Sequence, residues 1–397
     1  MVSISGLKTK KREREKGLRN LIGASLLACG LGVSGFAFAE PVKVGMITTL
    51  SGGGAGLGVD ARDGFMLALK LAGAKDIEVV TEDDAMKPEL AVQIADKMIQ
   101  SDKVDILTGI IWSNLAMAVV PNAVAQGKFY LSVNAGPSPL AGAKCDKNYF
   151  NVAYQNDNFH EAAGNYAQTE GIKKMFILAP NYPAGTDSLN GFKRFYKGEL
   201  VGEVYTKLGQ TDYAAEIAQI RASGADSVFF FLPGGMGIAF MKQYAQSGVE
   251  IPVMGPGFSF SQDVLGAIGD AALGAKNTAS WSPDLDNAKN KEFVTAFTSE
   301  YNRLPSIYAA QAFDTGSLIA TAAATASVKD ADAFRAALAA AEFDSVRGKF
   351  KFNTNHHPIQ DFYVREVVKN GEGVLTNKIV ATSFTDHQDA YAKDCKM

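Results

Sequence analysis

Val42-Lys-Val-Gly-Met-Ile-Thr48, followed by Ser51-Gly-Gly-Gly-Ala-Gly-Leu-Gly58 and then by residues 61–71, is the stretch that decides the fold class. Its first part is short and rich in residues that favour β-strands. In its last part Phe65 and Leu69 recur at helical spacing. The stretch therefore predicts a strand, a glycine-rich loop and a helix, in that order.

The same alternation continues along the chain and then starts again. The first series predicts further strands at 77–81, 106–109 and 130–133 and helices at 88–100 and 115–126. The second series predicts strands at 174–179, 203–207, 227–232 and 253–255 and helices at 188–197, 213–222, 238–246 and 262–267. Helices at 290–301, 309–326 and 332–341 and strands at 348–352 and 361–369 follow. Alternating strands and helices predict mostly parallel sheets flanked by helices, and two series without a low-complexity linker predict two lobes.

The first 39 residues have the composition of an export signal. Seven basic residues precede the uncharged run 21–39, which ends in the small-x-small triplet Ala37-Phe38-Ala39 that signal peptidase accepts. We predict export and cleavage after Ala39. Two alternatives stay open: a retained membrane anchor, because the run is close to the ~20 residues of a spanning helix, and lipidation of Cys29.

The charge of the chain argues against a nucleic-acid partner. Its 39 basic and 42 acidic residues give a net charge of -3. Loss of the seven bases and two acids of the leader would make this -8. Binding to phosphates requires a basic surface, so we expect no nucleic acid. With 47% hydrophobic and 20% charged residues, the chain is expected to form a soluble globular protein.

Cysteine usage predicts one disulfide. Without Cys29, the exported chain keeps an even pair, Cys145 and Cys395, in an oxidising compartment. We predict that they pair and so join the C-terminal tail to the middle of the chain. Two unpaired buried thiols are the alternative.

The sequence contains no recognisable constellation for catalysis or metal binding. It has no Gly-x-Ser-x-Gly motif, and its four histidines follow neither a triad order nor a metal-ligand spacing. We therefore expect no enzymatic activity, no metal and no cofactor. The pair His356-His357 precedes Pro358, which predicts a surface turn rather than a catalytic or metal site.

The glycine-rich stretch has one feature of a nucleotide site. Gly54, Gly56 and Gly58 follow a strand, and Glu82-Asp83-Asp84 end the next one, as in a dinucleotide fingerprint. The Gly-x-Gly-x-Gly spacing does not fit that fingerprint. We interpret the stretch as a flexible loop at the carboxyl end of a strand, where open α/β sheets bind ligands. A merely structural turn remains the alternative.

Several motifs resemble those of one known family. The segment Val44-Gly-Met-Ile-Thr-Thr-Leu-Ser-Gly52 resembles the first strand and loop of the branched-chain amino-acid type of periplasmic binding protein. Further matches are Val79-Val-Thr-Glu-Asp-Asp-Ala85, Val104-Asp-Ile-Leu-Thr-Gly109, Ala135-Gly-Pro-Ser-Pro139, Asp226-Ser-Val-Phe-Phe230, Met254-Gly-Pro256 and Tyr308-Ala-Ala310. The resemblance extends over 42–380 in the family's order. More narrowly, 134–139, Tyr154-Gln-Asn-Asp157 and the terminal Cys-Lys-Met397 resemble the subgroup that captures aromatic carboxylic acids.

The resemblance implies a fold and a function. It implies the type I periplasmic fold, with 40–153 and 284–357 in the first lobe, 154–283 and 358–397 in the second, and a three-stranded hinge between them. The protein would be the periplasmic, monomeric solute-binding component of an ABC importer, acting with membrane permease subunits. Its ligand would be a small aromatic carboxylate of the benzoate or cinnamate type. The alternatives are a branched-chain amino acid or amide, and, in a different class, a nucleotide-dependent enzyme.

By position, the resemblance also implies contacts from the first lobe to the ligand. These are Leu57 in the glycine-rich stretch, Trp112 with Ser113, and the turn formed by Asn134, Ala135 and Gly136. A hydroxyl and successive backbone N–H groups in a turn suit a carboxylate. Where the family has a threonine this sequence has Gly136, so one hydroxyl donor is lost.

On the second lobe the sequence departs from amino-acid binders. In those proteins an acidic residue after Met-Gly-Pro pairs with the ligand's ammonium group, whereas this chain has Gly257. An unpaired buried ammonium would be unfavourable by several kcal/mol. Phe258 and Phe260 follow and offer stacking surface, with Tyr154 and Tyr182 as further candidates for the wall. Ordinary core packing is the alternative for each of these aromatic residues and for Trp112.

Overall fold

The first five strands form one parallel sheet. We describe a computed structural model of the chain over residues 41–397. The strands lie in the order β2-β1-β3-β4-β5, with every neighbouring pair parallel. Their bounds are β1 Val42–Thr48, β2 Ile77–Asp83, β3 Ile106–Thr108, β4 Phe129–Ser132 and β5 Tyr149–Asn151. Strand β1 pairs on both edges and is almost entirely buried, which explains its run of apolar residues.

The second sheet is mixed and has eight strands. Its order is β11-β12-β10-β9-β8-β6-β7, and β13 pairs with β12. Strands β6 to β10 pair in parallel with one another, whereas β12 is antiparallel to β10, β11 and β13. The bounds are β6 Lys174–Pro180, β7 Glu199–Thr206, β8 Ser227–Phe230, β9 Val253–Pro256, β10 Lys276–Ala279, β11 Lys351–Phe352, β12 Pro358–Lys369 and β13 Leu375–His387.

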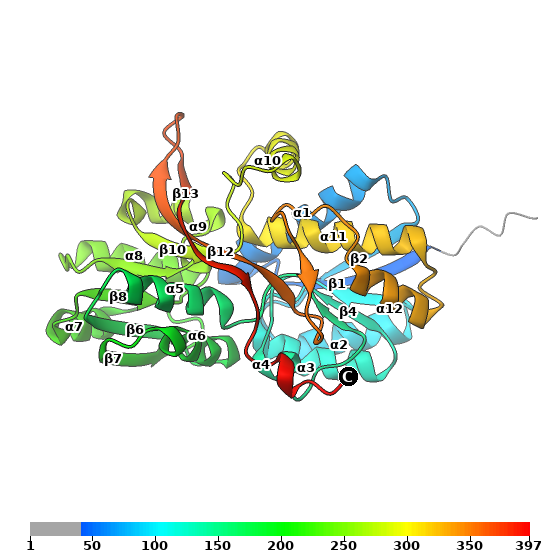
Figure 1. Cartoon of the computed structure of the whole chain (residues 1–397), viewed down its shortest axis with the longest axis horizontal. Helices are drawn as coiled ribbons and strands as arrows, with labels where there is room; N and C mark the ends of the chain where they lie inside the picture. The colour runs from blue at the N-terminus through cyan, green and yellow to red at the C-terminus, as the bar shows by residue number, and fades with distance from the viewer. Residues whose placement is uncertain (1–40) are drawn as a thin grey trace, which may run out of the picture. The chain divides into compact units, whose positions relative to one another are not determined.

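Helices flank both sheets, which lie side by side in Figure 1. The helices that follow the strands of the first sheet are α1 Ala55–Ala72, α2 Pro88–Gln100, α3 Ser113–Ala125 and α4 Ser138–Ala141. Those of the second are α5 Asn158–Thr169, α6 Pro183–Phe195, α7 Ala214–Ser223, α8 Gly235–Gln246 and α9 Gln262–Ile268. Later helices are α10 Ala288–Tyr301, α11 Ile307–Thr325 and α12 Ala331–Ala340, and short 3₁₀ turns are η1 Gly52–Gly54, η2 Gly257–Ser259, η3 Gly269–Ala272 and η4 Ala392–Asp394.

The chain passes between the two sheets three times. It leaves the first sheet after β5, returns after β10 to the helices α10 to α12, of which α11 packs along α1, and crosses again along β12. At the start of that last crossing the Asn151 N–H of β5 donates to the His356 carbonyl at 2.9 Å, whereas Tyr363 further along β12 pairs with Ala279 of β10. This is the architecture of two α/β lobes that the sequence predicts. The residue bounds of the lobes stay a prediction.

The predicted link between Cys145 and Cys395 is present as a disulfide, with the two Cα atoms 5.6 Å apart. It attaches the tail that follows β13 of the second sheet to the segment between β4 and β5 of the first. The disulfide is therefore a covalent connection between the two sheets in addition to the three chain crossings.

Two sequence-based expectations about the chain need correction. The glycine-rich stretch is not a flexible loop, because it forms η1 and the first turn of α1. A Cβ atom on Gly58 would lie 1.9 Å from the Thr49 carbonyl oxygen, so this glycine allows helix α1 to pack closely on the strand end. The turn at His356-His357 is not at the surface: His357 is fully buried, and the ring of His356 stacks on Phe150 at 4.0 Å.

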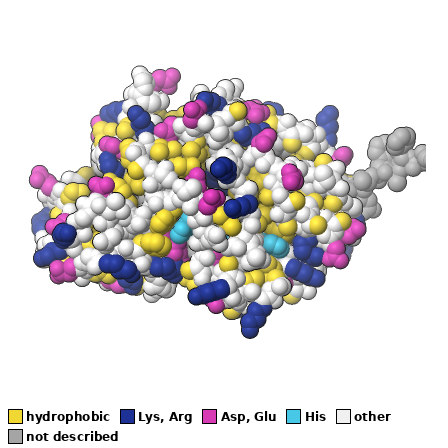
Figure 2. All heavy atoms as spheres, in the orientation of Figure 1, with side chains coloured by type: hydrophobic (Ala, Val, Ile, Leu, Met, Phe, Trp, Pro, Cys, Tyr) yellow, Lys and Arg dark blue, Asp and Glu magenta, His cyan; other side chains and the backbone are white. Residues whose placement is uncertain are grey.

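The predicted leader, the possible anchor and Cys29 all lie outside the described residues. Within residues 41–397, none of the helices has the length and apolar character needed to cross a membrane. The same residues contain no group of three or more histidine, cysteine or acidic side chains able to hold a metal ion. Figure 2 shows acidic and basic side chains interspersed over the visible face rather than a basic patch.

Candidate functional site

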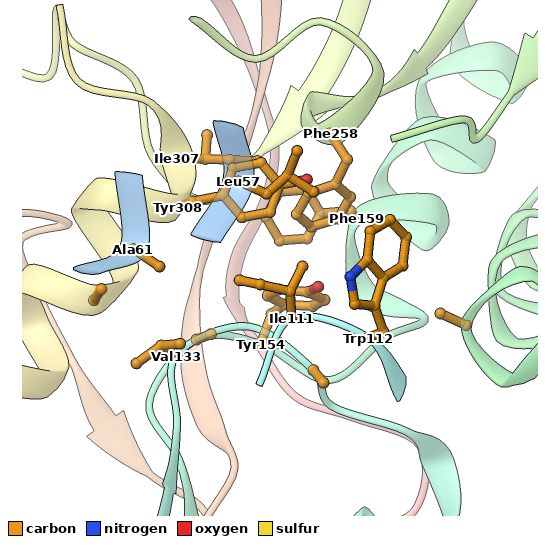
Figure 3. Close-up of a cluster of buried hydrophobic side chains, with 14 of the residues drawn as sticks. Leu57, Ala61, Ile111, Trp112, Val133, Tyr154, Phe159, Phe258, Ile307 and Tyr308 are labelled. Atoms are coloured by element: carbon orange, nitrogen blue, oxygen red, sulfur yellow. The ribbon is translucent and has the colours of Figure 1, made fainter. Parts of the chain in front are cut away.

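Aromatic rings from both sides of the molecule meet between the two sheets. Phe258, which follows β9, lies 5.0 Å from Tyr154, 4.5 Å from Phe159 and 5.9 Å from Tyr308, measured between ring centroids. Tyr154 lies in the first crossing, Phe159 in α5 and Tyr308 in α11. All four are buried. In Figure 3 their side chains converge with those of Ile111, Leu57 and Trp112.

A second row of rings continues from this cluster. Trp112, just before α3 of the first sheet, lies 6.3 Å from Tyr182, which precedes α6 of the second. Tyr182 stacks with Phe231 at 6.3 Å, and Phe231 lies 6.0 Å from Phe258. The Trp112 indole N–H donates to Thr49 Oγ1 at 2.9 Å, which fixes the orientation of its ring. Predicted site residues Trp112, Tyr154, Tyr182 and Phe258 thus belong to one continuous aromatic surface.

Ser113 supplies a hydroxyl beside this surface. It is the first residue of α3, a helix of 13 residues, and it is buried. The N–H groups of a helix's first turn have no carbonyl partners within the helix, and their dipoles favour an anion. Ser113 Oγ accepts a hydrogen bond from Asn156 Nδ2 at 3.1 Å, and its hydroxyl donates to Asn156 Oδ1 only at the long distance of 3.5 Å. Because this donor contact is much longer than a usual O–H···O bond, the proton can turn to a nearer acceptor.

The turn at 134–136 is built differently from the sequence-based expectation of free donors. The Asn134 amide donates to the Ile111 carbonyl at 2.7 Å and accepts from the Tyr154 hydroxyl at 3.2 Å, so it holds those groups in place. The Gly136 N–H donates to Asn156 Oδ1 at 3.0 Å. The Ala135 carbonyl accepts from Ser132 Oγ at 2.7 Å. This turn therefore orients the site more than it offers donors.

The glycine at 136 has a steric reason. A Cβ atom at this position would lie 2.1 Å from the Tyr154 carbonyl oxygen and 2.4 Å from Asn151 Nδ2. A threonine could not be accommodated without moving the first crossing. The loss of that hydroxyl donor, which the sequence suggests, therefore reflects the close approach of two backbone segments.

Gly257 does not face the aromatic cluster in the way the sequence suggests. A Cβ atom on it would lie 2.8 Å from Arg365 Nη2 and 3.1 Å from Ala279 Cβ. Arg365 is buried, and burial lowers its pKa to about 9. Its guanidinium donates to Asn277 Oδ1 at 2.7 and 2.9 Å. An acidic side chain at 257 would thus contact a buried cation. The glycine at this position is therefore weaker evidence for the ligand class than the aromatic rings are.

Two further predicted residues occupy different surroundings. Leu57 of α1 is buried. If Gly234, which precedes α8 of the second sheet, carried a Cβ atom, that atom would lie 3.1 Å from Leu57 Cδ1. It therefore lies at the junction between the sheets. Phe260 instead packs against Phe230 of β8 at 5.3 Å, within the core of the second sheet. We leave Phe260 out of the candidate site.

A family model described as periplasmic binding protein matches residues 41–372 of this chain. The chain belongs to this family. Among solved structures, a solute-binding protein of an ABC transporter from R. palustris, in complex with benzoate, is 33% identical, with 90% of this chain and 100% of that chain covered and a TM-score of 0.85. Another, from Rhodopseudomonas palustris BisB5 with 3,4-dihydroxybenzoic acid, is 29% identical, with 88% and 99% covered and a TM-score of 0.80. Among curated relatives, "Leu/Ile/Val-binding protein homolog 6" of Brucella melitensis is 28% identical over 367 residues, which cover 87% of this chain and 92% of that protein.

This periplasmic binding protein is a solute-binding component of an ABC transporter. Proteins of this family bind small molecules, interact with membrane permeases and are not enzymes. Membership therefore excludes the nucleotide-dependent enzyme that the glycine-rich stretch left open. It also implies a periplasmic location.

Sequence reasoning missed a charged network behind the site of this periplasmic binding protein. Arg194 of α6 donates to Asp157 at 2.7 Å and also contacts Glu161. His387 Nε2 lies 2.6 Å from Glu161 Oε2, and the Tyr391 hydroxyl donates to Asp157 at 2.9 Å. Asp157 lies in the motif Tyr154-Gln-Asn-Asp157, but its partners come from α5, α6, β13 and the tail, so no local motif could reveal the network.

The pKa of one carboxyl group in this network is raised, and that of another is lowered. Burial and the neighbouring Asp187 raise the pKa of Asp157 to about 7. Burial also favours the neutral form of Glu161, but its bonds to His387 and Asn158 and the charge of Arg194 outweigh this and lower its pKa. The charge behind the aromatic rings therefore depends on the protonation of Asp157 and Glu161.

Proposed function

We propose that this protein captures a small aromatic carboxylate of the benzoate or cinnamate type for an ABC importer. The observation that carries the proposal is the continuous aromatic surface that runs from Trp112 to Phe258 and Tyr308 between the two sheets. Flat rings stack best on such surfaces, and each ring pair adds about 0.5–1.5 kcal/mol beyond area burial. The benzoate and 3,4-dihydroxybenzoate complexes of the related proteins support the same ligand class.

Ser113 is proposed to bind the carboxylate group. Its hydroxyl donates only a long bond of 3.5 Å to Asn156 Oδ1, which a carboxylate oxygen would replace, and the N-terminus of α3 adds a favourable dipole. We propose that the contacts to the ligand come from Leu57, Trp112, Ser113, Ala135, Tyr154, Tyr182 and Phe258. Asn134 and Gly136 would act indirectly, because their polar groups already bond to Ile111, Tyr154 and Asn156.

One observation favours a branched-chain amino acid as the second candidate. In the described part of the chain, Asp263 Oδ1 of α9 is buried without a hydrogen-bond partner. Burial and the charge of Asp60 raise the pKa of Asp263 to about 7. Burial, together with the charge of Asp263, raises the pKa of Tyr308, a member of the aromatic cluster. An ammonium group would supply the missing donor, as expected if the Leu/Ile/Val-binding homologues share their ligand with this chain.

Calorimetry with four probes separates these candidates. Benzoate tests the ring and the charge together, cyclohexanecarboxylate removes the aromatic ring, methyl benzoate removes the charge, and leucine carries an ammonium group. The proposal predicts tight binding of benzoate, weaker binding of cyclohexanecarboxylate and the largest loss for methyl benzoate. Micromolar leucine binding with benzoate silent would replace the aromatic acid by the amino acid. In that case Asp263→Asn should abolish binding.

Ser113→Ala tests the site itself. A hydrogen bond to a charged group contributes about 1.5–3 kcal/mol, so benzoate affinity should fall roughly 10- to 150-fold. Ser223→Ala is the matched control, because Ser223 Oγ donates to the Ile220 carbonyl and accepts from the Ala225 N–H, both at the end of α7. Unchanged affinity of a normally folded Ser113→Ala protein would remove Ser113 from the site.

We also propose that the chain is exported, is cleaved after Ala39 and acts as a monomer with permease subunits. Sequencing of the N-terminus of protein recovered from a periplasmic extract tests the cleavage site. Light scattering of the purified protein tests the monomer. A mass of twice that of the cleaved chain, or a start other than Glu40, would contradict these points.

A further inference from the structure

Asp187 connects the two halves of the molecule next to the candidate site. It belongs to α6, which flanks the second sheet, and only 6% of it is exposed. Its carboxylate accepts the Ser138 N–H at 3.0 Å and the Ser138 hydroxyl at 2.7 Å. Ser138 begins α4, in the segment between β4 and β5 of the first sheet. The carboxylate therefore receives two donors from across the junction.

Asn156 connects this contact to Ser113. It lies in the first crossing and is buried. Its Nδ2 donates to Asp187 Oδ2 at 2.9 Å and to Ser113 Oγ at 3.1 Å, while its Oδ1 accepts from the Gly136 N–H. Asp187 is thus one side chain away from the hydroxyl that is proposed to bind the carboxylate.

The contact between Asp187 and Ser138 can exist only while α4 of the first lobe and α6 of the second lie against each other. Burial raises the pKa of Asp187, and the bonds from Ser138 and Asn156, with the charge of Arg194, act in the opposite direction. A buried carboxylate without donors is strongly unfavourable. Separation of α4 from α6 would remove both Ser138 donors at once, so the carboxylate would have to regain water at the same moment.

We propose that Asp187 is a closure latch and a positioning residue: its bonds to Ser138 hold the two lobes together, and through Asn156 they orient Ser113 toward the ligand. This inference rests on the proposed function, because Ser113 is its point of contact with the ligand. It adds residues that do not touch the ligand but set how long the ligand stays bound. Asn156 transmits the effect because it bonds to both Asp187 and Ser113.

Stopped-flow measurement of benzoate binding, followed by tryptophan fluorescence, tests the latch. A contact that must break before the ligand can leave affects dissociation more than association. Asp187→Ala and Ser138→Ala should each raise the dissociation rate constant about tenfold, the effect of one charge-assisted hydrogen bond, and change the association rate constant less than twofold. The double variant should be no worse than Asp187→Ala alone, because Asp187→Ala already removes the hydroxyl bond that Ser138→Ala removes. Additive effects, or dissociation at the wild-type rate, would overturn the latch.

A control and a second readout separate this inference from the proposed function. Asp226→Ala is the control, because Asp226 accepts the Lys174 N–H at 2.9 Å at the start of β6, within the second sheet. It should leave both rate constants unchanged. Small-angle X-ray scattering of the ligand-free proteins needs no ligand. Asp187→Ala should increase the radius of gyration relative to wild type, and equal radii would refute the latch. If the wild-type protein does not bind benzoate, the proposed ligand class is refuted, whereas the scattering result still tests the latch.

Discussion

Arg347 is the side chain whose loss should most weaken the connection between the two sheets. It is 4% exposed and makes four hydrogen bonds to groups from three segments. It donates to Asp314 Oδ2 of α11 at 2.8 Å, to the carbonyls of Val152 and Ala153 in the first crossing at 2.6 and 2.8 Å, and to Gln360 Oε1 of β12 at 2.8 Å. We predict that Arg347→Met strongly destabilises the protein.

The expected loss of stability follows from the buried carboxylate of Asp314, which would remain without its cation. Removing one partner of a buried ion pair typically destabilises by about 3–5 kcal/mol, because the other charge is left uncompensated. Asp314 would keep its bonds from Ser345 Oγ at 2.6 Å and the Val346 N–H at 2.9 Å. Burial already raises the pKa of Asp314, and Arg347 opposes that effect. Without Arg347 the pKa rises further, so the stability of the variant should fall more than that of wild type as the pH increases above the ordinary carboxyl value of 3.8.

Urea denaturation followed by circular dichroism measures this loss. The double variant Asp314→Leu/Arg347→Met should recover part of the stability, because it leaves no unpaired buried carboxylate. Lys193→Met is the control: Lys193 and Glu203 are each 32% exposed, and such pairs contribute only about 0–1 kcal/mol. An Arg347→Met protein within about 1 kcal/mol of wild type, or a double variant no more stable than the single one, would refute the reasoning.

Three further predictions rest on other parts of the structure. An aromatic ligand should change the fluorescence of Trp112, so Trp281→Phe should keep the signal and Trp112→Phe should lose it; the reverse would move the ligand away from Trp112. Burial lowers the pKa of His160 to about 3, so on acidification the unfolded state binds the extra proton before the folded state does. The free energy of unfolding should therefore fall between about pH 6.5 and pH 3, by at most about 1.4 kcal/mol per pH unit. In urea melts over this range, His160→Gln should show a smaller fall. Alkylation of unreduced, denatured protein should find no free thiol at Cys145 or Cys395, and Cys395→Ser should lower the melting temperature, since the chain-entropy model gives a loop of 250 residues about 4–5 kcal/mol; two alkylated cysteines would contradict the disulfide.

Local sequence is sufficient to predict the bounds of some elements, because their own residue types indicate where they begin and how they are buried. The strand Val42–Thr48 and the helix Pro88–Gln100 have the bounds that the pattern predicts. The first is largely apolar apart from Lys43 and Thr48, as is typical of a central strand in a parallel sheet. The second begins with a proline, which suits the first turn of a helix because its missing N–H needs no partner there.

Elements defined by partners far away in the chain were not predictable in this way. Strand β13, Leu375–His387, shows little alternation, and it is a strand because it pairs with β12. Helix α5 has polar residues on its buried face, including His160 and Glu161, whose partners Ser188 and His387 come from α6 and β13. No pattern within these segments contains that information.

The sequence by itself determined the fold class, the family and the cysteine pair, because periodicity, motif order and parity are properties of the chain alone. Only the tertiary structure decided which residues meet. Tyr154, Phe258 and Tyr308 come together from three distant segments, whereas Phe260, two residues after Phe258, faces a different core. The direction of each side chain depends on how the strands and crossings pack, and a sequence motif specifies residue types without specifying those directions.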